Sequence, residues 1–279
     1  MSQKSYNNSP TLYLIPTPIG NLDDITLRAI DILKKVEVVF SEDTRVTKNL
    51  LDYLNIQKKL ISNHNYNEKE NKEKLIKFLK DGYDVGLVSD RGTPVISDPG
   101  YILTKEAIRC GYNVVSLPGP TALIPALTVS GIEPMPFMFY GFLNSKQSKR
   151  LQELENLKSV AATIIIYESP HRIEETLKNI YTVLGNRNIS ISREISKKFE
   201  EIYRGKVDDV IKEINEPKGE FVIVIEKCSE NKYETLTVIQ HVNLYIKEGY
   251  DIKDAIKQVA KERKMVKKEV YDIYHNIKR

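Results

Sequence analysis

Turn-forming residues dominate the stretch VSDRGTPVISDPG, residues 88–100, which follows a short apolar run. Its glycines permit a positive φ or a close approach of backbone to a ligand, its prolines stiffen the turn, and its aspartates can accept hydrogen bonds from amides. These residues are Asp90, Gly92, Pro94, Asp98, Pro99 and Gly100. A rigid loop with exposed amides favours ligand binding, although loops of this composition also occur as plain connectors.

Two further turns have related chemistry. The segment PTPIGNLDDIT (16–26) places Pro16, Pro18 and Gly20 between an apolar run and a helical pattern, as a phosphate-binding loop or an ordinary strand-to-helix turn would. It lacks the glycines of G-x-G-x-x-G and the lysine of G-x-x-x-x-G-K-[ST], so it has no dinucleotide or NTP signature. The segment PGPTA (118–122) opens onto a helix in the same way.

Titratable groups follow two other apolar runs. In YESPHR, His171 stands close to Glu168 and is either a proton acceptor or a structural hydrogen-bonding residue. In SEDTR, Asp43 and Arg45 fit either an ion-paired helix start or part of a polar site. Several such turns at the ends of apolar runs predict one shared cleft.

Basic residues gather in two places. The segment SREISKKFEEIYRG (192–205) fits phosphate contacts or a solvated edge strand. Residues 231–279 contain 11 Lys and Arg against 7 Asp and Glu, an excess equal to the whole net charge of +4. This excess indicates an acidic partner for the tail or a solvated lysine-rich helix. Candidate phosphate contacts in the tail are Lys257, Lys261, Arg263, Lys264, Lys267 and Lys268.

The elements that must position these residues alternate between apolar runs and helical patterns. We expect a first series of strands at 12–16, 36–40, 59–62, 84–89 and 113–117, with helices at 25–36, 44–54, 67–80 and 101–110. After an apolar helix that ends at Gly131, a second series has strands at 137–143, 161–167, 188–194, 200–205 and 220–226, with helices at 146–157, 170–184 and 207–214. The alternation predicts α/β layers, a mixed second sheet, and ligands at the carboxyl ends of strands.

The C-terminal segment predicts two or three small helices with the rhythm of a helix-turn-helix. Its apolar residues recur at helical spacing and are Ile256, Val259, Ala260, Val266, Val270 and Ile273. We therefore expect an α/β domain at 11–117, a second α/β domain at 118–228 and a helical tail at 234–279.

Composition argues against several classes of protein. Cys110 and Cys228, the two cysteines, have no C-x-x-C partner, so neither a disulfide framework nor a thiolate zinc site is predicted. The start MSQKSYNNSP lacks an apolar h-region, and no stretch approaches the ~18–20 apolar residues of a bilayer span. We expect a cytoplasmic protein with no metal and no membrane partner.

Eight ordered segments resemble the ribosomal RNA small subunit methyltransferase I family, a branch of the tetrapyrrole methylase superfamily. They span residues 11–226 and are TPIGNLDDITLRA, EDTR, VSDRGTPVISDPGY, LPGPTALIPAL, FYGFL, YESPHR, REISKKFEEIYRG and KGEFVIVIE. The resemblance implies a class III methyltransferase fold, in which two α/β domains hold a folded S-adenosyl-L-methionine in the cleft between them. It also implies a homodimer that methylates a cytidine ribose 2′-hydroxyl in the decoding region of 16S rRNA, with free rRNA or the small ribosomal subunit as substrate.

Cofactor-binding residues follow from the same resemblance. They are Pro16, Pro18, Asp90, Gly92, Thr93, Pro94, Ile96, Thr121, Ala122, Tyr167, Lys218 and Gly219. One residue departs from the family, because Arg91 stands where a small Ala is expected. A cleft-facing Arg91 would meet the cofactor carboxylate or an RNA phosphate, whereas an outward-facing one would have little significance.

The implied reaction is an in-line displacement by a ribose hydroxyl, which is a poor nucleophile. A group that accepts its proton typically gives a ~100 to 10,000-fold acceleration. Glu168 and His171 are the candidate acceptors, and Asp43 and Arg45 are candidate helpers that line the cleft. Two alternatives are a tetrapyrrole methyltransferase acting on a precorrin-like macrocycle and a non-catalytic RNA-binding protein.

Overall fold

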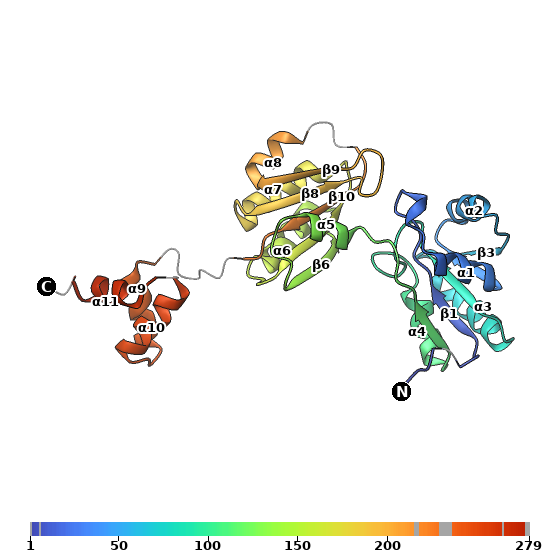
Figure 1. The fold of residues 1–279 in the computed structure, drawn as a ribbon, viewed down its shortest axis with the longest axis horizontal. Coiled ribbons are helices and arrows are strands. Elements are labelled where there is room, and N and C mark those ends of the chain that lie inside the picture. The colour runs from blue at the N-terminus through green and yellow to red at the C-terminus, as the bar shows by residue number, and fades with distance from the viewer. Residues whose placement is uncertain (1, 6, 215–217, 229–235, 264, 277–279) are drawn as a thin grey trace. The chain divides into compact units, whose positions relative to one another are not determined.

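The computed structural model describes the chain except for residues 1, 6, 215–217, 229–235, 264 and 277–279. Its contacts divide it into two compact units, a larger one of residues 1–158 and 162–226 and a smaller one of residues 159–161 and 227–279. Figure 1 shows the strands of the larger unit and the helices that connect them. Each unit has a core of its own.

The first sheet of the larger unit has five parallel strands in the order β3-β2-β4-β1-β5. The strands are β1 (Thr11–Leu14), β2 (Val38–Ser41), β3 (Lys59–Ser62), β4 (Val85–Val88) and β5 (Asn113–Ser116). The connecting elements are η1 (Leu22–Asp24), α1 (Leu27–Lys35), α2 (Thr44–Tyr53), α3 (Glu68–Lys80) and α4 (Tyr101–Arg109). Parallel neighbours require such crossovers, and the predicted α/β alternation is confirmed.

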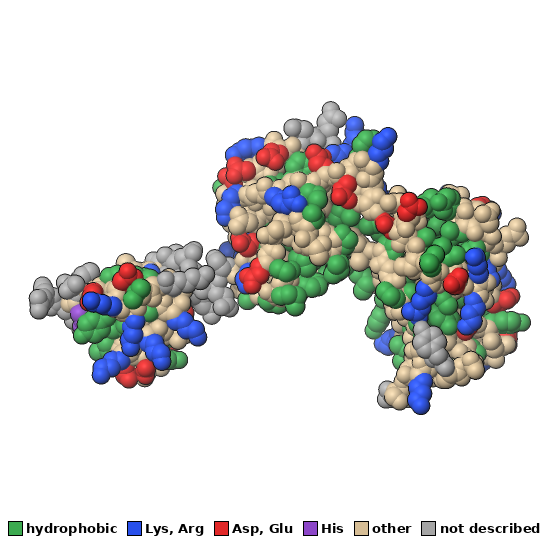
Figure 2. Space-filling model, viewed as in Figure 1, with side chains coloured by type: hydrophobic (Ala, Val, Ile, Leu, Met, Phe, Trp, Pro, Cys, Tyr) green, Lys and Arg blue, Asp and Glu red, His purple; other side chains and the backbone are tan. Residues whose placement is uncertain are grey.

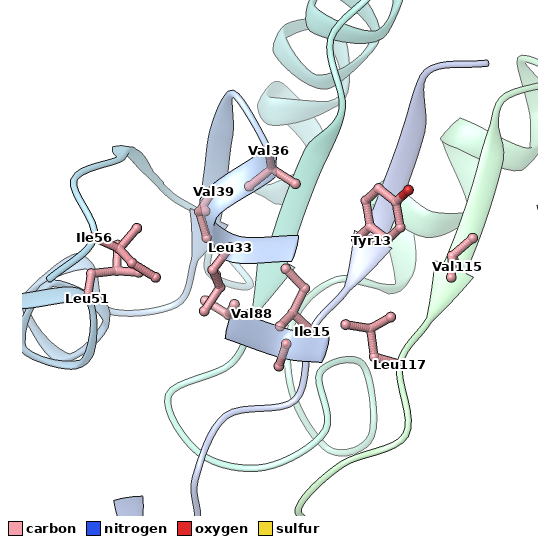
Figure 3. Packing of buried hydrophobic residues seen from close by; sticks show 11 residues of the cluster. Tyr13, Ile15, Leu33, Val36, Val39, Leu51, Ile56, Val88, Val115 and Leu117 are labelled. Carbon is pink, nitrogen blue, oxygen red and sulfur yellow. The ribbon is translucent and has the colours of Figure 1, made fainter. Parts of the chain in front are cut away.

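Both faces of this sheet are buried. Tyr13 of β1 packs on one face with Leu33 of α1, in the cluster drawn in Figure 3. Leu12 points to the opposite face, where Leu75 and Leu103 of α3 and α4 cover it. Strands buried on both sides need apolar residues at successive positions, which explains why they appear in the sequence as continuous apolar runs.

The second sheet has the order β6-β7-β10-β8-β9. Strand β6 runs parallel to β7, and the remaining neighbours are antiparallel, so the predicted mixed sheet is confirmed. The strands are β6 (Phe137–Phe142), β7 (Thr163–Glu168), β8 (Asn188–Arg193), β9 (Glu201–Lys206) and β10 (Phe221–Ile225). The helices are α5 (Leu123–Val129), α6 (Gln147–Leu157), α7 (Ile173–Leu184) and α8 (Val207–Glu213). Helix α5 packs against β7 and β10.

The smaller unit contains α9 (Val238–Lys247), α10 (Ile252–Glu262) and α11 (Lys267–Asn276), around a core that includes Val242, Ile256 and Val259. The expected apolar stripe is wrong at Val266 and Ile273, which are 63% and 36% exposed. Helix α11 begins after Val266, and it turns Val270 and Tyr274, four positions apart, into the core. The expected start of the tail, at residue 234, lies outside the described residues.

Among the residues that the structure describes, no helix combines the length and the apolar character that a membrane crossing requires.

Candidate active site

A cavity of about 590 Å³ opens in the larger unit, lined by the turns after β4 and β7, the turn before α5 and residues 220–222 at the start of β10. Its volume lies within the ~300–1,000 Å³ of typical small-molecule sites. Seven of the predicted cofactor-binding residues line it, namely Asp90, Gly92, Thr93, Ile96, Thr121, Ala122 and Tyr167. The other five, which are not among its lining residues, are Pro16, Pro18, Pro94, Lys218 and Gly219.

The turns of the first sheet are tied to one another. Backbone hydrogen bonds of 2.9 Å run in both directions between Thr17 and Gly92. The Thr93 hydroxyl donates to the carbonyl oxygen of Pro120 over 3.1 Å. Gly119 packs so closely on Pro16 that an added Cβ would lie 2.7 Å from the Pro16 Cβ. Pro16 therefore packs against the turn before α5, which lines the cavity.

The loop after β4 has a strained backbone. Val95 and Ser97 have φ of 78° and 66°, a region that L-residues other than Asn and Asp rarely adopt. The end of the loop is fixed by the buried carboxylate of Glu68, which accepts from the amides of Gly100 at 2.9 Å and Ile102 at 2.8 Å. Strained residues persist only where their surroundings hold them, and such residues cluster at functional sites.

Three carboxylates lie together beside this loop. Partial burial, and then the charges of Glu42 and Asp90, raise the pKa of Asp98 to about 7. Partial burial and the charge of Asp90 also raise the pKa of Glu42. Asp98 lines the cavity. The sequence identifies Asp98 only as a turn residue and gives no sign that its pKa is raised.

Asp43 and Arg45 are occupied with each other at the start of α2. Asp43 is the N-cap residue, and its carboxylate accepts from the Arg45 amide at 2.9 Å and from the Arg45 guanidinium at 2.6 Å. Hydrogen bonds from the Arg45 side chain and backbone lower the pKa of Asp43 to about 2. The Asp43 amide donates to Asp90 at 2.9 Å. Neither residue is among those that line the cavity, and the Asp43 amide is the group that contacts the lining residue Asp90.

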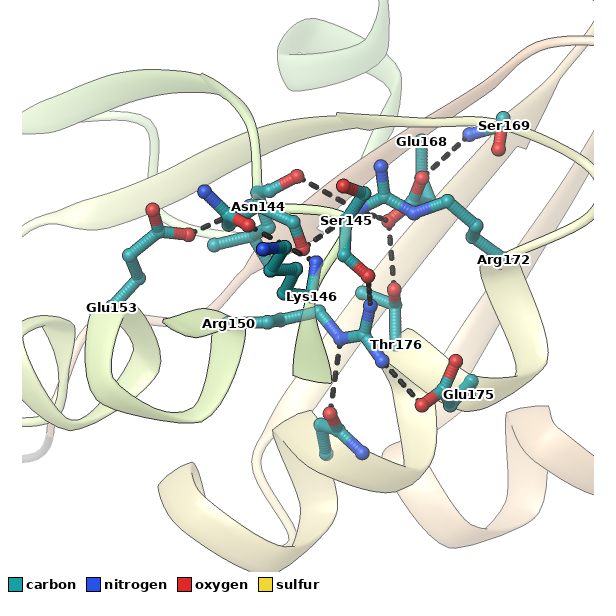
Figure 4. A network of polar contacts seen from close by, with 12 residues as sticks. Asn144, Ser145, Lys146, Arg150, Glu153, Glu168, Ser169, Arg172, Glu175 and Thr176 are labelled. Carbon is teal, nitrogen blue, oxygen red and sulfur yellow. Dashed lines mark hydrogen bonds and ion pairs between the residues drawn. The ribbon is translucent and has the colours of Figure 1, made fainter. Parts of the chain in front are cut away.

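Glu168 lines the cavity and is fully engaged in hydrogen bonds (Figure 4). Its carboxylate accepts from the Ser169 amide at 2.8 Å and the Thr176 hydroxyl at 2.7 Å, and it lies 3.3 Å from the guanidinium of Arg172. The Arg172 guanidinium also donates to the carbonyl oxygen of Leu143 at 2.7 Å. The group therefore joins the turn after β7 to the segment that follows β6.

His171 is exposed and is not among the residues that line the cavity. Within the described part of the chain, no hydrogen bond or ion pair holds its ring. The structure therefore brings Glu168 to the cavity and leaves His171 outside its lining.

Arg91 points to the second sheet. Its Nη1 lies 2.5 Å from Oε1 of Glu220, and both residues line the cavity. The Glu220 carboxylate also accepts from Lys197 at 2.9 Å, and Lys197 reaches Glu194 at 2.8 Å. The residue that departs from the family pattern thus links the loop after β4 to the start of β10.

Comparisons with known proteins identify the chain. Residues 11–211 match the family of Tetrapyrrole (Corrin/Porphyrin) Methylases. The chain is 46% identical, over 99% of its length and 97% of the relative, to the ribosomal RNA small subunit methyltransferase I of Bacillus subtilis (strain 168). A second relative of that name, from Halalkalibacterium halodurans, is 44% identical over 98% of this chain and 99% of its own. The chain belongs to the ribosomal RNA small subunit methyltransferase I family.

The fold of this methyltransferase I family member is shared with more distant enzymes. A cobalt precorrin-4 methyltransferase superposes with a TM-score of 0.55 at 18% identity, covering 81% of this chain and 98% of that one. A diphthine synthase superposes with a TM-score of 0.60 at 14% identity, covering 77% and 90%. The resemblance to the tetrapyrrole methylases is thus confirmed for the fold, and the family makes the chain a methyltransferase.

The cavity of the methyltransferase I family member fits S-adenosyl-L-methionine, on which tetrapyrrole methylases in general depend. Apolar side chains such as Ile96, Phe142 and Val222 can cover a flat purine, while Asp90 suits a ligand that contains a sulfonium and an ammonium. The described residues include no group of three or more His, Cys, Asp or Glu that would hold a metal ion.

Proposed function

We propose that this chain transfers a methyl group from S-adenosyl-L-methionine to the 2′-hydroxyl of a cytidine ribose in the decoding region of 16S rRNA. The observation that supports this most is the 46% identity to a ribosomal RNA small subunit methyltransferase I over 99% of the chain, which includes the helical unit. A relative that shares only the catalytic fold would leave that unit unmatched.

The cofactor is held, in this proposal, by the residues that the sequence resemblance named. They are Pro16, Pro18, Asp90, Gly92, Thr93, Pro94, Ile96, Thr121, Ala122, Tyr167, Lys218 and Gly219. Those that line the cavity contact the ligand, and Pro16 and Pro18 fix the loops that do so. When bound, S-adenosyl-L-methionine supplies an electrophilic methyl group on a sulfonium. The chain itself must then orient the ribose and remove its proton.

Asp98 is the proton acceptor in this proposal. Four carboxylates line the cavity, and two of them, Glu168 and Glu220, are neutralised by guanidinium or ammonium groups. The third, Asp90, accepts a hydrogen bond from the backbone amide of Asp43. The pKa of Asp98, at about 7, suits a base that works near neutrality, because it combines a useful ionised fraction with proton affinity.

In this proposal the four catalytic candidates named from the sequence have supporting roles. They are Glu168, His171, Asp43 and Arg45. Glu168 holds the turn after β7, the backbone amide of Asp43 holds Asp90, and Arg45 pairs with the Asp43 carboxylate at the start of α2. His171, exposed beside Arg172, is available to an RNA phosphate. None of the four needs to accept the proton directly.

One experiment separates this function from its two alternatives. The purified protein is incubated with methyl-labelled S-adenosyl-L-methionine and either small ribosomal subunits, naked 16S rRNA or a porphyrinoid. Label recovered as 2′-O-methylcytidine after nuclease digestion supports the proposal. Label in the macrocycle identifies a tetrapyrrole methyltransferase, and tight RNA binding without transfer identifies a non-catalytic RNA-binding protein. Either of these results overturns the proposal.

Assembly belongs to the same proposal. We place a homodimer in the cytoplasm, with domains at 11–117, 118–228 and 234–279. The edge strand β6 exposes Phe137 and Tyr140, which gives a second copy an apolar surface. Light scattering on the purified chain tests the dimer, and limited proteolysis tests the domain boundaries.

A further inference from the structure

Five lysines of the smaller unit are exposed and make no hydrogen bond or ion pair within the described part of the chain. Lys253, Lys257 and Lys261 follow one another every fourth residue on α10, and Lys267 and Lys268 begin α11. We call these five the lysine face. In Figure 2, Lys and Arg side chains stand on the visible surface of this unit.

Three carboxylates of the same unit make contacts within it. Asp251 accepts from the amides at the start of α10, and Glu269 accepts from the Val266 amide before α11. Glu262 accepts from the Tyr245 hydroxyl at 2.6 Å and from Gln258 at 2.7 Å. These three carboxylates are therefore engaged in contacts other than with the lysine face, in a segment that contains 11 Lys and Arg against 7 Asp and Glu.

A buried contact holds α9 against the end of α10. His241 is fully buried, its Nδ1 accepts from Arg263 at 3.1 Å, and its Nε2 lies 3.0 Å from Glu262. Burial and the Arg263 charge lower the pKa of His241, and a neutral ring with its proton on Nε2 satisfies both contacts. Arg263 is thus an internal residue, unlike the phosphate contact expected from the sequence. Lys264 lies outside the described residues.

The position of the lysines on α11 is unfavourable for the helix itself. Lys267 and Lys268 occupy the first turn, where the helix dipole is positive and acidic residues are preferred. Nearby Tyr271 is 50% exposed, and its ring lies 4.2 Å from that of His275. An exposed aromatic ring beside unpaired lysines is the combination that single-stranded nucleic acids use for stacking and phosphate contact.

We propose that the lysine face and Tyr271 form a docking surface for RNA, with the lysines on successive phosphates and Tyr271 stacked on an unpaired base. The inference rests on the proposed function for the choice of RNA, but its test does not require methyl transfer. Phosphate contacts of this kind add affinity and salt dependence without reading the sequence. The choice of nucleotide is then left to the cavity in the larger unit.

The test uses the full chain with Lys253→Gln, Lys257→Gln and Lys261→Gln combined. The matched control combines Lys69→Gln, Lys77→Gln and Lys80→Gln, three exposed lysines of α3 with the same loss of charge. Binding to a labelled single-stranded fragment of 16S rRNA is measured between 0.05 and 0.3 M KCl. We expect the first variant to lose at least about tenfold in affinity near 0.1 M salt, and its slope of log K against log salt to fall by about 2. The control should change far less.

Two further measurements complete the test. Tyr271→Ala should weaken binding to the fragment several-fold, whereas Tyr271→Phe, which keeps the stacking surface, should not. Affinity for S-adenosylhomocysteine should be equal in all variants. Equal losses in the α10 and α3 variants, no loss in either, or preferential binding to phosphatidylserine vesicles would each overturn the inference. Failure of the proposed function would appear separately, as absent methyl transfer by the unaltered protein that still binds RNA.

Discussion

The guanidinium of Arg91 and the carboxylate of Glu220 lie 2.5 Å apart and join the loop after β4 to the start of β10. Both side chains are more than half exposed, at 53% and 60%. An exposed ion pair typically contributes only about 0–1 kcal/mol to stability, because water and salt screen it. Its importance here lies in its position, since both residues line the same cavity.

Arg91→Ala should therefore separate ligand affinity from stability. We expect affinity for S-adenosylhomocysteine to fall several-fold, because the two sides of the cavity lose their link, while the free energy of unfolding changes by no more than about 1 kcal/mol. Calorimetric titration and urea unfolding measure the two quantities. Arg109→Ala, which removes the ion pair of the exposed Arg109 with Glu106 on α4, serves as the control. Unchanged ligand affinity in Arg91→Ala would contradict the bridging role.

Asp98→Asn should lower the rate of methyl transfer by about 100 to 10,000-fold, the usual contribution of a general base. Asp98 accepts a proton only when ionised, so kcat/KM of the unaltered protein should rise about tenfold per pH unit below pH about 7 and level off above it. Rate measurements from pH 5.5 to 8.5 check this profile.

Glu42→Gln provides an internal control for that assignment. The charge of Glu42 helps to raise the pKa of Asp98, so its removal should move the midpoint of the profile to lower pH without abolishing activity. Asp52→Asn, an exposed change on α2, should leave the profile unaltered. A profile that keeps its midpoint in Glu42→Gln would assign the titration to another group.

The same carboxyl group should limit stability at alkaline pH. Its pKa is about 7 in the folded chain against an ordinary value of 3.8, so between these values the folded state holds a proton that the unfolded state lacks. Stability attributable to Asp98 is therefore present at low pH and lost as pH rises toward 7. We expect Asp98→Asn to melt a few degrees higher than the parent at pH 8 and the difference to vanish near pH 4. Thermal melts without ligand at both pH values measure it, and a lower melting point at pH 8 would refute it.

Gly119→Ala should disturb the packing of the turn before α5 against Pro16. The added Cβ would lie 2.7 Å from Cβ and 2.9 Å from Cγ of Pro16, a rigid ring that cannot turn aside. Such overpacking costs about 1–3 kcal/mol, and the displaced loop should also bind S-adenosylhomocysteine more weakly. Gly205→Ala is the matched control, because its added Cβ meets only Val210 at 3.5 Å. Equal behaviour of the two variants in urea unfolding would show that the Pro16 contact is unimportant.

The fold could be predicted from the sequence because its signals are local. Apolar runs marked the strands, and the expected helix at 44–54 agrees with the observed Thr44–Tyr53 to within a residue. Local periodicity was insufficient to predict which residues are buried in the last helix, α11. Val266 and Ile273 fit a helical stripe, yet the packing of α11 on α9 and α10 selected Val270 and Tyr274 instead. Periodicity identifies a face, but tertiary packing decides which turn of that face is buried.

The site was predictable in part for a similar reason. Glycines and prolines mark a turn by themselves, so the loop after β4 was found from composition. The raised pKa of Asp98 could not be predicted because it depends on strand order. Ser41 pairs with Val88, so Glu42 and Asp90, which follow β2 and β4, come together although they are far apart in the chain. No pattern within a single segment of the sequence shows that Glu42 and Asp90 lie close together.

The reciprocal amide bonds between Thr17 and Gly92 form an isolated antiparallel bridge between the loops that follow the parallel strands β1 and β4. The two loops cannot move independently, because displacement of either one would break both hydrogen bonds. A substitution that displaces the loop after β4 at Gly92 should therefore also displace the loop after β1 at Thr17, so that the two ends of this link change together.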